Sequence, residues 1–156
     1  MNYTWHWGIL LQPPNAALLV EGVVWTLGVT ALSWTIALAV GSVVGLTRSL
    51  AWAPGRLVAT AFVEVFRNVP PLVQLFLWFF VFPEVMPDDI GLWIKRDLRM
   101  PEVTTSVVCI GLFSAARVAE QVRAGIVLGR AKRRPAALAT GLRRGQAYRL
   151  VVLPVA

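Results

Sequence analysis

One uncharged, apolar run of 26 residues, 22–47, most constrains what this chain can fold into. About 20 apolar residues in a helix, rising ~1.5 Å each, cross the ~30 Å hydrocarbon core of a bilayer. The run therefore predicts a transmembrane helix, and its length disfavours a buried helix of a soluble protein. A cleaved signal peptide is also disfavoured, because residues 1–20 contain no lysine or arginine.

The composition agrees with a membrane protein. The chain is 57% hydrophobic and only 15% charged, whereas soluble domains are about a quarter charged. Its high hydrophobicity excludes a disordered chain, and its one cysteine excludes a disulfide scaffold. We therefore expect an all-α, multi-spanning integral membrane protein.

Two further segments predict spans. Residues 57–82 are mostly apolar and are interrupted by Glu64, Arg67, Asn68 and the pair Pro70-Pro71. We interpret them as one kinked span, because neighbouring helices in a membrane can satisfy the carbonyls that a proline frees. Residues 103–122 form the third predicted span, with a charged C-terminal end. Its small residues suit helix contacts in lipid: Gly111, Ser114, Ala115 and Ala116.

The charges between the spans predict their orientation. The connection 48–56 holds two basic residues and no acidic one, and 123–149 holds eight basic residues and no acidic one. The stretch 1–21 lacks lysine and arginine, while 83–102 has three basic and five acidic residues. By the positive-inside rule, 48–56 and 123–149 are cytoplasmic, and the N-terminus and 83–102 lie outside. The outer connection 83–102 is interpreted as a short re-entrant or surface helix.

The basic C-terminal segment predicts two short helices. Pro135 suits a helix start, Gly141 suits a helix end, and a second helix is expected from near Gln146 to Leu153-Pro154. Residue types alone leave three roles open: binding anionic lipid headgroups, which we favour, a nucleic-acid patch, or the start of a fourth span.

The spacing in this segment resembles the cytoplasmic coupling loop of bacterial ABC-importer permeases, E-A-A, three residues, G, nine residues, I-x-L-P. Here Pro135 replaces the glutamate and Val151 replaces the isoleucine. The resemblance implies a coupling loop at about 129–154 that contacts a separate ATP-binding subunit, and it argues against a nucleic-acid role. The residues it assigns to this contact are Pro135, Ala136, Ala137, Gly141, Leu153 and Pro154.

Residues 64–74 are similar to the E-x-x-R-x-x-P-x-x-x-Q signature of polar amino-acid permeases. The stretches 5–9 and 111–117 look most like the glutamate/aspartate branch. This resemblance implies a bacterial inner-membrane permease that pairs with an identical or sister permease, an ATP-binding subunit and a periplasmic amino-acid-binding protein. Members of the group have about five spans, two of them after the coupling loop, so we expect this chain to be truncated.

Charged residues inside the predicted spans have two interpretations. Glu64 and Arg67 lie three positions apart, as do Arg117 and Glu120, which favours two local ion pairs that fix helix orientation. Alternatively, Arg67 meets a substrate carboxylate with its two parallel donors. That reading defines a predicted substrate path of Glu64, Arg67, Asn68, Pro70 and Gln74.

The sequence offers no support for catalysis. It has no G-x-x-x-x-G-K-[ST] phosphate-binding loop, no nucleophile–base constellation, and a single histidine, His6, without other ligands at metal-binding spacing. We therefore expect neither an enzyme, nor a metal site, nor a cofactor in this chain. The alternative to a permease is a non-transporting membrane interaction protein with a basic, lipid-facing loop; a membrane-embedded enzyme is disfavoured.

Overall fold

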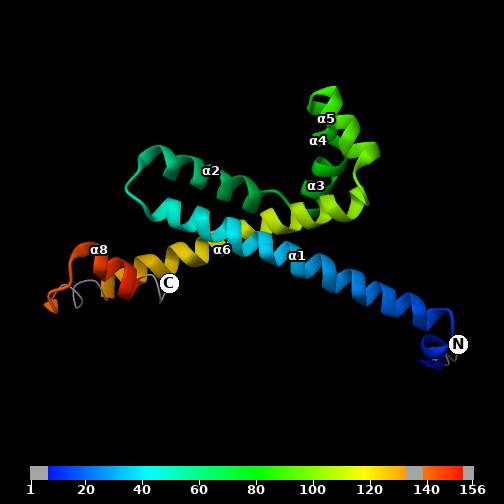
Figure 1. Ribbon diagram of the computed structural model, residues 1–156, viewed down its shortest axis with the longest axis horizontal. Coiled ribbons are helices and arrows are strands. Elements are labelled where there is room, and N and C mark those ends of the chain that lie inside the picture. The colour runs from blue at the N-terminus through cyan, green and yellow to red at the C-terminus, as the bar shows by residue number, and fades with distance from the viewer. Residues whose placement is uncertain (1–6, 133–138, 153–156) are drawn as a thin grey trace, which may run out of the picture.

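The computed structural model describes residues 7–132 and 139–152, and every regular element in these ranges is a helix. The predicted all-α class is confirmed. Two long helices, α1 and α6, lie side by side, and shorter helices connect them (Figure 1). The elements are η1 (Trp7–Leu11), α1 (Asn15–Ser49), α2 (Ala53–Asn68), α3 (Pro71–Phe76), η2 (Leu77–Val81), α4 (Phe82–Val85), α5 (Asp88–Leu92), η3 (Trp93–Asp97), α6 (Pro101–Lys132), α8 (Arg144–Ala147) and η4 (Tyr148–Val152).

Two helices are long and apolar enough to cross a membrane: α1, and α6 over Pro101–Gly129. The third candidate span is a bent pair, α2 followed by the helical stretch Pro71–Val85, whose axes differ by 106°. The break falls at the predicted proline pair. The two parts are bent by 106°, as in a broken span or a re-entrant loop, and the single kinked span stays a prediction.

Small residues bring α1 and α6 into close contact. Every fourth residue of α1 from Ser33 to Ser49 is buried. A Cβ added at Gly41 would lie 2.7 Å from the carbonyl oxygen of Ala115, and one at Gly45 would lie 2.7 Å from that of Ala119. Only glycine permits this approach, which is how small residues favour helix association in lipid. The buried α1 residues are Ser33, Ala37, Gly41, Gly45 and Ser49.

The contacts show that α1 and α6 run parallel. Ser33 donates a hydrogen bond of 3.2 Å to the carbonyl oxygen of Val107, 74 positions later. Gly41 faces Ala115 and Gly45 faces Ala119, with the same separation. Because both helices run in one direction, the segment between them must return once along the pair, and α2 lies alongside both (Figure 1).

A small apolar cluster joins α2 to α6. Val63 of α2 is 1% exposed and packs with the fully buried Ala116 and Ala119 of α6. Phe62 and Phe66, with ring centroids 4.6 Å apart, pack against this cluster. Every third or fourth residue of α2 thus faces the pair formed by α1 and α6, as expected for an amphipathic helix.

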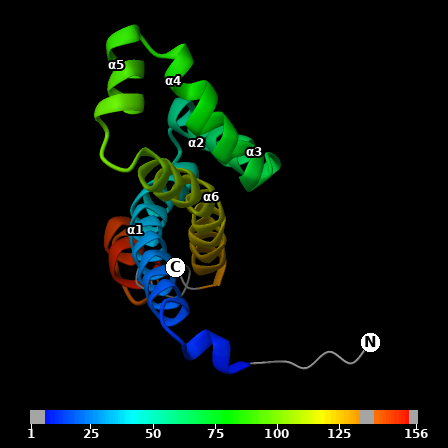
Figure 2. The ribbon, with the colours of Figure 1, turned by 90° about the vertical axis from the view of Figure 1, so that its right-hand side faces the viewer.

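Two parts of the molecule extend beyond this core. Residues 17–28 of α1 are all exposed, and the N-terminal part of the helix extends away from its neighbours (Figure 1). The α4 and α5 helices stand off from the α1–α6 pair (Figure 2). Lys95 of η3 donates to Glu84 of α4, which links the two halves of the predicted surface connection.

Candidate functional site

The bend after α2 is built around Gln74. Because Pro70 and Pro71 lack backbone N–H groups, they cannot donate to the last carbonyls of α2. Gln74, 4% exposed, replaces them: its Nε2 donates to the carbonyl oxygen of Phe66 at 2.9 Å and to that of Val69 at 2.8 Å. Since both neighbours are acceptors, the amide nitrogen must face them.

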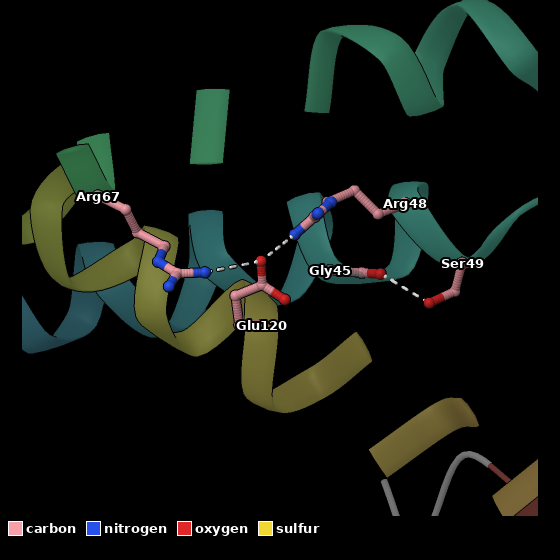
Figure 3. A network of polar contacts seen from close by, with 5 residues as sticks. All are labelled: Gly45, Arg48, Ser49, Arg67 and Glu120. Atoms are coloured by element: carbon pink, nitrogen blue, oxygen red, sulfur yellow. Dashed lines mark hydrogen bonds and ion pairs between the residues drawn. The ribbon is translucent and has the colours of Figure 1, made fainter. Parts of the chain in front are cut away.

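A second polar centre joins three helices at one carboxylate. Oε1 of Glu120, on α6, accepts from Nη1 of Arg48 at 2.7 Å and from Nη1 of Arg67 at 3.3 Å. The two arginines, from α1 and α2, approach from opposite sides (Figure 3). The Arg48 side chain is only 9% exposed, whereas that of Arg67 is 56% exposed. Glu120 therefore neutralises a nearly buried cation and also holds a half-exposed one.

The predicted local ion pairs are wrong. Within the described residues, no ion pair joins Glu64 to Arg67 or Arg117 to Glu120. Glu120 instead binds arginines 72 and 53 positions away. Arg117 places its guanidinium over the ring of Phe113, with Cζ 4.6 Å from the ring centroid. Sequence reasoning missed Arg48 altogether, because local spacing carries no signal for a contact between separate helices.

The residues of the predicted substrate path do not converge. Gln74 is buried inside the bend, while Glu64, Arg67, Asn68 and Pro70 are exposed. The structure links Arg67 to Glu120 and Gln74 to the backbone of α2. In the described ranges, no three His, Cys, Asp or Glu side chains are grouped as metal ligands would be.

The C-terminal segment carries one of the predicted coupling residues in a distinctive conformation. Gly141 has φ +85°, the left-handed region that favours glycine at a helix end. The helix that follows, α8, begins at Arg144, close to the predicted start near Gln146. Gln146 accepts a hydrogen bond of 3.0 Å from the Arg143 backbone N–H, which is half of a capping box. Pro135, Ala136, Ala137, Leu153 and Pro154 lie outside the described residues.

Known proteins similar to this chain identify its family. The glutamate/aspartate import permease protein GltJ of Escherichia coli K12 is 42% identical over 165 residues, which cover 99% of this chain and 66% of that protein. The glutamate/aspartate import permease protein GltK of E. coli O6:H1 is 33% identical over 155 residues, with the same coverage. The chain belongs to the permease family of polar amino-acid ABC importers.

Other similar permeases differ in substrate. The glutamine transport system permease protein GlnP of E. coli K12 is 33% identical over 143 residues, covering 92% of the chain and 61% of that protein. A crystal structure of an amino acid ABC transporter with histidines superposes with a TM-score of 0.78 at 28% identity, covering 98% of this chain and 65% of that one. No protein-family model matches the chain.

This permease chain spans about two thirds of the length of the glutamate/aspartate permeases that it matches. The similar proteins are permease subunits, so the prediction of a non-enzymatic, membrane-embedded subunit is confirmed. In this family, ATP hydrolysis belongs to a separate subunit.

Proposed function

We propose that the chain is the permease component of an ATP-driven importer of polar amino acids, with glutamate and aspartate as its substrates. The observation that carries this proposal is 42% identity to a glutamate/aspartate import permease over 99% of the chain. Glutamine permeases match at 33%. Acidic substrates are favoured because the glutamate/aspartate permease is more similar to the chain than the glutamine permease is. The guanidinium of an exposed arginine such as Arg67 can pair with a substrate carboxylate.

The proposed partners are an ATP-binding subunit, a second permease that is identical or a sister chain, and a periplasmic amino-acid-binding protein. The spacing from Ala136 to Pro154 supports the first of these. Small residues near Gly141 allow close approach, and flanking arginines offer paired donors to acidic groups of the ATP-binding subunit. Closure of that subunit on ATP would then displace this loop and the helices attached to it.

We place the chain in a bacterial inner membrane with its N-terminus periplasmic. The parallel course of α1 and α6 supports this orientation, because both C-terminal ends then lie on one side. Those ends lead into the two basic connections without acidic residues, 48–56 and 123–149. Positive charge concentrated on one side favours the cytoplasm.

Glu64, Arg67, Asn68, Pro70 and Gln74 remain the proposed path segment. Arg67 donates to Glu120 through one nitrogen, Nη1. A guanidinium has five N–H donors, so Arg67 retains donors for a substrate carboxylate. Arg67→Lys should reduce uptake by about tenfold, because lysine lacks the planar pair of donors. Uptake at the wild-type rate in that variant would reject a carboxylate contact at Arg67.

The test is transport by the tagged chain in its native membrane complex. We expect the ATP-binding subunit to co-purify in detergent, and reconstituted vesicles with the binding protein to take up labelled aspartate and glutamate only with ATP. A Gly141→Val variant should retain less of the ATP-binding subunit, because φ +85° strains a β-branched residue. Gly28→Val, in open space on α1, is the control.

The possible outcomes separate the alternatives. Preferred uptake of glutamine would reject the acidic substrates while leaving the importer assignment. No ATP-dependent uptake of any amino acid, together with binding to anionic vesicles and no retained ATP-binding subunit, would favour the non-transporting interaction protein.

A further inference from the structure

Arg117 is a cation in an apolar helix without a carboxylate partner in the described ranges. It lies two positions from Ala115, the midpoint of the membrane-length stretch Pro101–Gly129 of α6. Its side chain is exposed and contacts the face of the Phe113 ring, with Cζ 4.6 Å from the centroid. An aromatic face stabilises the positive charge but uses none of the in-plane N–H donors.

The nearest acidic residue along the helix is already occupied. Glu120, one turn further on, accepts from Arg48 at 2.7 Å and from Arg67 at 3.3 Å. Because Arg48 is nearly buried, Glu120 cannot turn to Arg117 without leaving that cation uncompensated. An anion that pairs with Arg117 would therefore have to come from outside the described residues.

The position of Arg117 on α6 determines where that anion arrives. Residues packed against α1, such as Ala115 and Ala119, are fully buried on another face of the helix. The exposed face repeats at intervals of three, four or seven residues and carries two polar groups in its middle, Arg117 and Gln121. Its members are Ile110, Arg117, Gln121, Ala124 and Leu128.

The side chain does not run toward the nearer basic end of the helix. Phe113 lies one turn toward the N-terminal end, so the guanidinium over its ring points away from the arginine-rich C-terminal end of α6. An arginine that merely reached for lipid headgroups at that end would extend in the opposite direction. A charge held at membrane depth is expected to face a protein interior or a water-filled path.

We propose that Arg117 binds the side-chain carboxylate of the transported amino acid and thereby selects acidic substrates over their amides. The proposal rests on the importer function proposed above. The Phe113 ring holds the guanidinium plane while its edges donate two parallel hydrogen bonds to a carboxylate. A neutral amide supplies one acceptor and two donors, so it leaves the cation unpaired and is rejected.

The experiment compares substrates, because a specificity residue changes their ratio. The reconstituted, tagged complex is assayed for ATP-dependent uptake of labelled glutamate and glutamine in the wild type and in Arg117→Gln and Arg117→Lys variants. We expect Arg117→Gln to lower the glutamate-to-glutamine ratio at least tenfold, and Arg117→Lys to retain an intermediate ratio. Arg123→Gln, an exposed arginine on another face of α6, should keep the wild-type ratio.

Each other outcome overturns the proposal in a recognisable way. Equal loss of glutamate and glutamine uptake in Arg117→Gln would show a role in folding or assembly. Loss of the second permease from the purified variant would show that Arg117 pairs with a carboxylate of that subunit. If the wild-type complex transports no amino acid, the importer function itself fails and this inference falls with it; if it transports glutamate and Arg117→Gln keeps the ratio, only the inference fails.

Discussion

Two arginines share one carboxylate oxygen of Glu120 but depend on it to different degrees. The Arg48 side chain is 9% exposed and lies 2.7 Å from that oxygen, while the Arg67 side chain is 56% exposed and 3.3 Å away. A nearly buried cation loses most of its hydration, so its ion pair compensates a real desolvation penalty. A half-exposed cation retains water, and its pair contributes little.

We therefore predict that Glu120→Gln destabilises the protein far more than Arg67→Gln does. Glu120→Gln leaves Arg48 without its counter-charge, at a cost of about 1–3 kcal/mol, whereas Arg67→Gln should cost less than about 1 kcal/mol. Thermal unfolding in detergent measures both variants. Equal shifts in Tm would contradict the assignment of Arg48 as the main partner of Glu120.

Gln74 has a structural role that the signature spacing did not reveal. Its Nε2 donates to the carbonyl oxygen of Phe66, which the missing N–H of Pro70 leaves without a donor, and also to that of Val69. We predict that Gln74→Leu, similar in size, destabilises the bend by about 1–3 kcal/mol because both carbonyls lose their donor. Limited proteolysis between Asn68 and Pro71 should accelerate in this variant. An unchanged cleavage rate would mean that neighbouring groups or lipid can replace the amide.

The spacing of charged residues within one helix predicted the wrong partner for Glu120. Residues three positions apart on a helix can pair, which made Arg117 the expected partner of Glu120. Arg48 and Arg67 displaced it because tertiary packing brings them to the same carboxylate from α1 and α2. No local pattern encodes that arrangement.

Among the helices, the close contact between α1 and α6 depends on two residues of α1 that have no side chain, Gly41 and Gly45. A Cβ at Gly41 would lie 2.6 Å from the Cβ of Val118, and one at Gly45 would lie 2.9 Å from the Cβ of Val122. Both distances are below normal van der Waals contact. Each glycine thus leaves a recess on α1 that receives a valine of α6. This close packing holds the helices together in lipid, where the hydrophobic effect does not drive helix association.

We predict that Gly41→Val separates α1 from α6 and lowers the free energy of unfolding by about 1–3 kcal/mol, the usual cost of overpacking. Gly28→Val, in a part of α1 with open space around it, should have little effect. Cross-linking of a Ser33→Cys, Val107→Cys pair in a Cys109→Ala background reports the contact directly. Efficient cross-linking in the presence of Gly41→Val would contradict the proposed fit.

Element positions were largely predictable, and their angles were not. Uncharged length predicted α1, small residues such as Gly111 and Ala115 predicted the contact face of α6, and a proline pair predicted the break after α2. The bend of 106° depends on how α3 packs on α6 and on Gln74. Those contacts join separate helices, so periodicity within one helix cannot reveal them.

For the whole molecule, the parallel course of α1 and α6 fixes which ends share a side. The N-terminal end of α1 and the segment before Pro101 lie toward one end of the pair, and Ser49 and Lys132 lie toward the other. The residues between Ser49 and Pro101 must therefore run back once from one end of the pair to the other, whether the bent pair lies in the membrane or at its surface.

We predict an alternating labelling pattern for single cysteines in a Cys109→Ala background. Cysteines at Leu11 and Met100 should react with a membrane-impermeant reagent applied to intact cells with a permeable outer membrane. Cysteines at Leu50 and Arg143 should react only after the inner membrane is permeabilised, because the basic connections are cytoplasmic. Reaction of Arg143→Cys in intact cells would reverse the proposed orientation.

The constant separation of 74 positions between facing residues of α1 and α6 limits how this pair can respond to load. Sliding by a fraction of a turn would drive Val118 or Val122 out of its recess and against the backbone of α1. The smallest axial slip that restores a comparable fit is one helical turn, ~5.4 Å. We therefore expect a force on the end of α6 to move α1 and α6 together as one rigid unit, by tilting or by a discrete step of one turn, and not by gradual sliding.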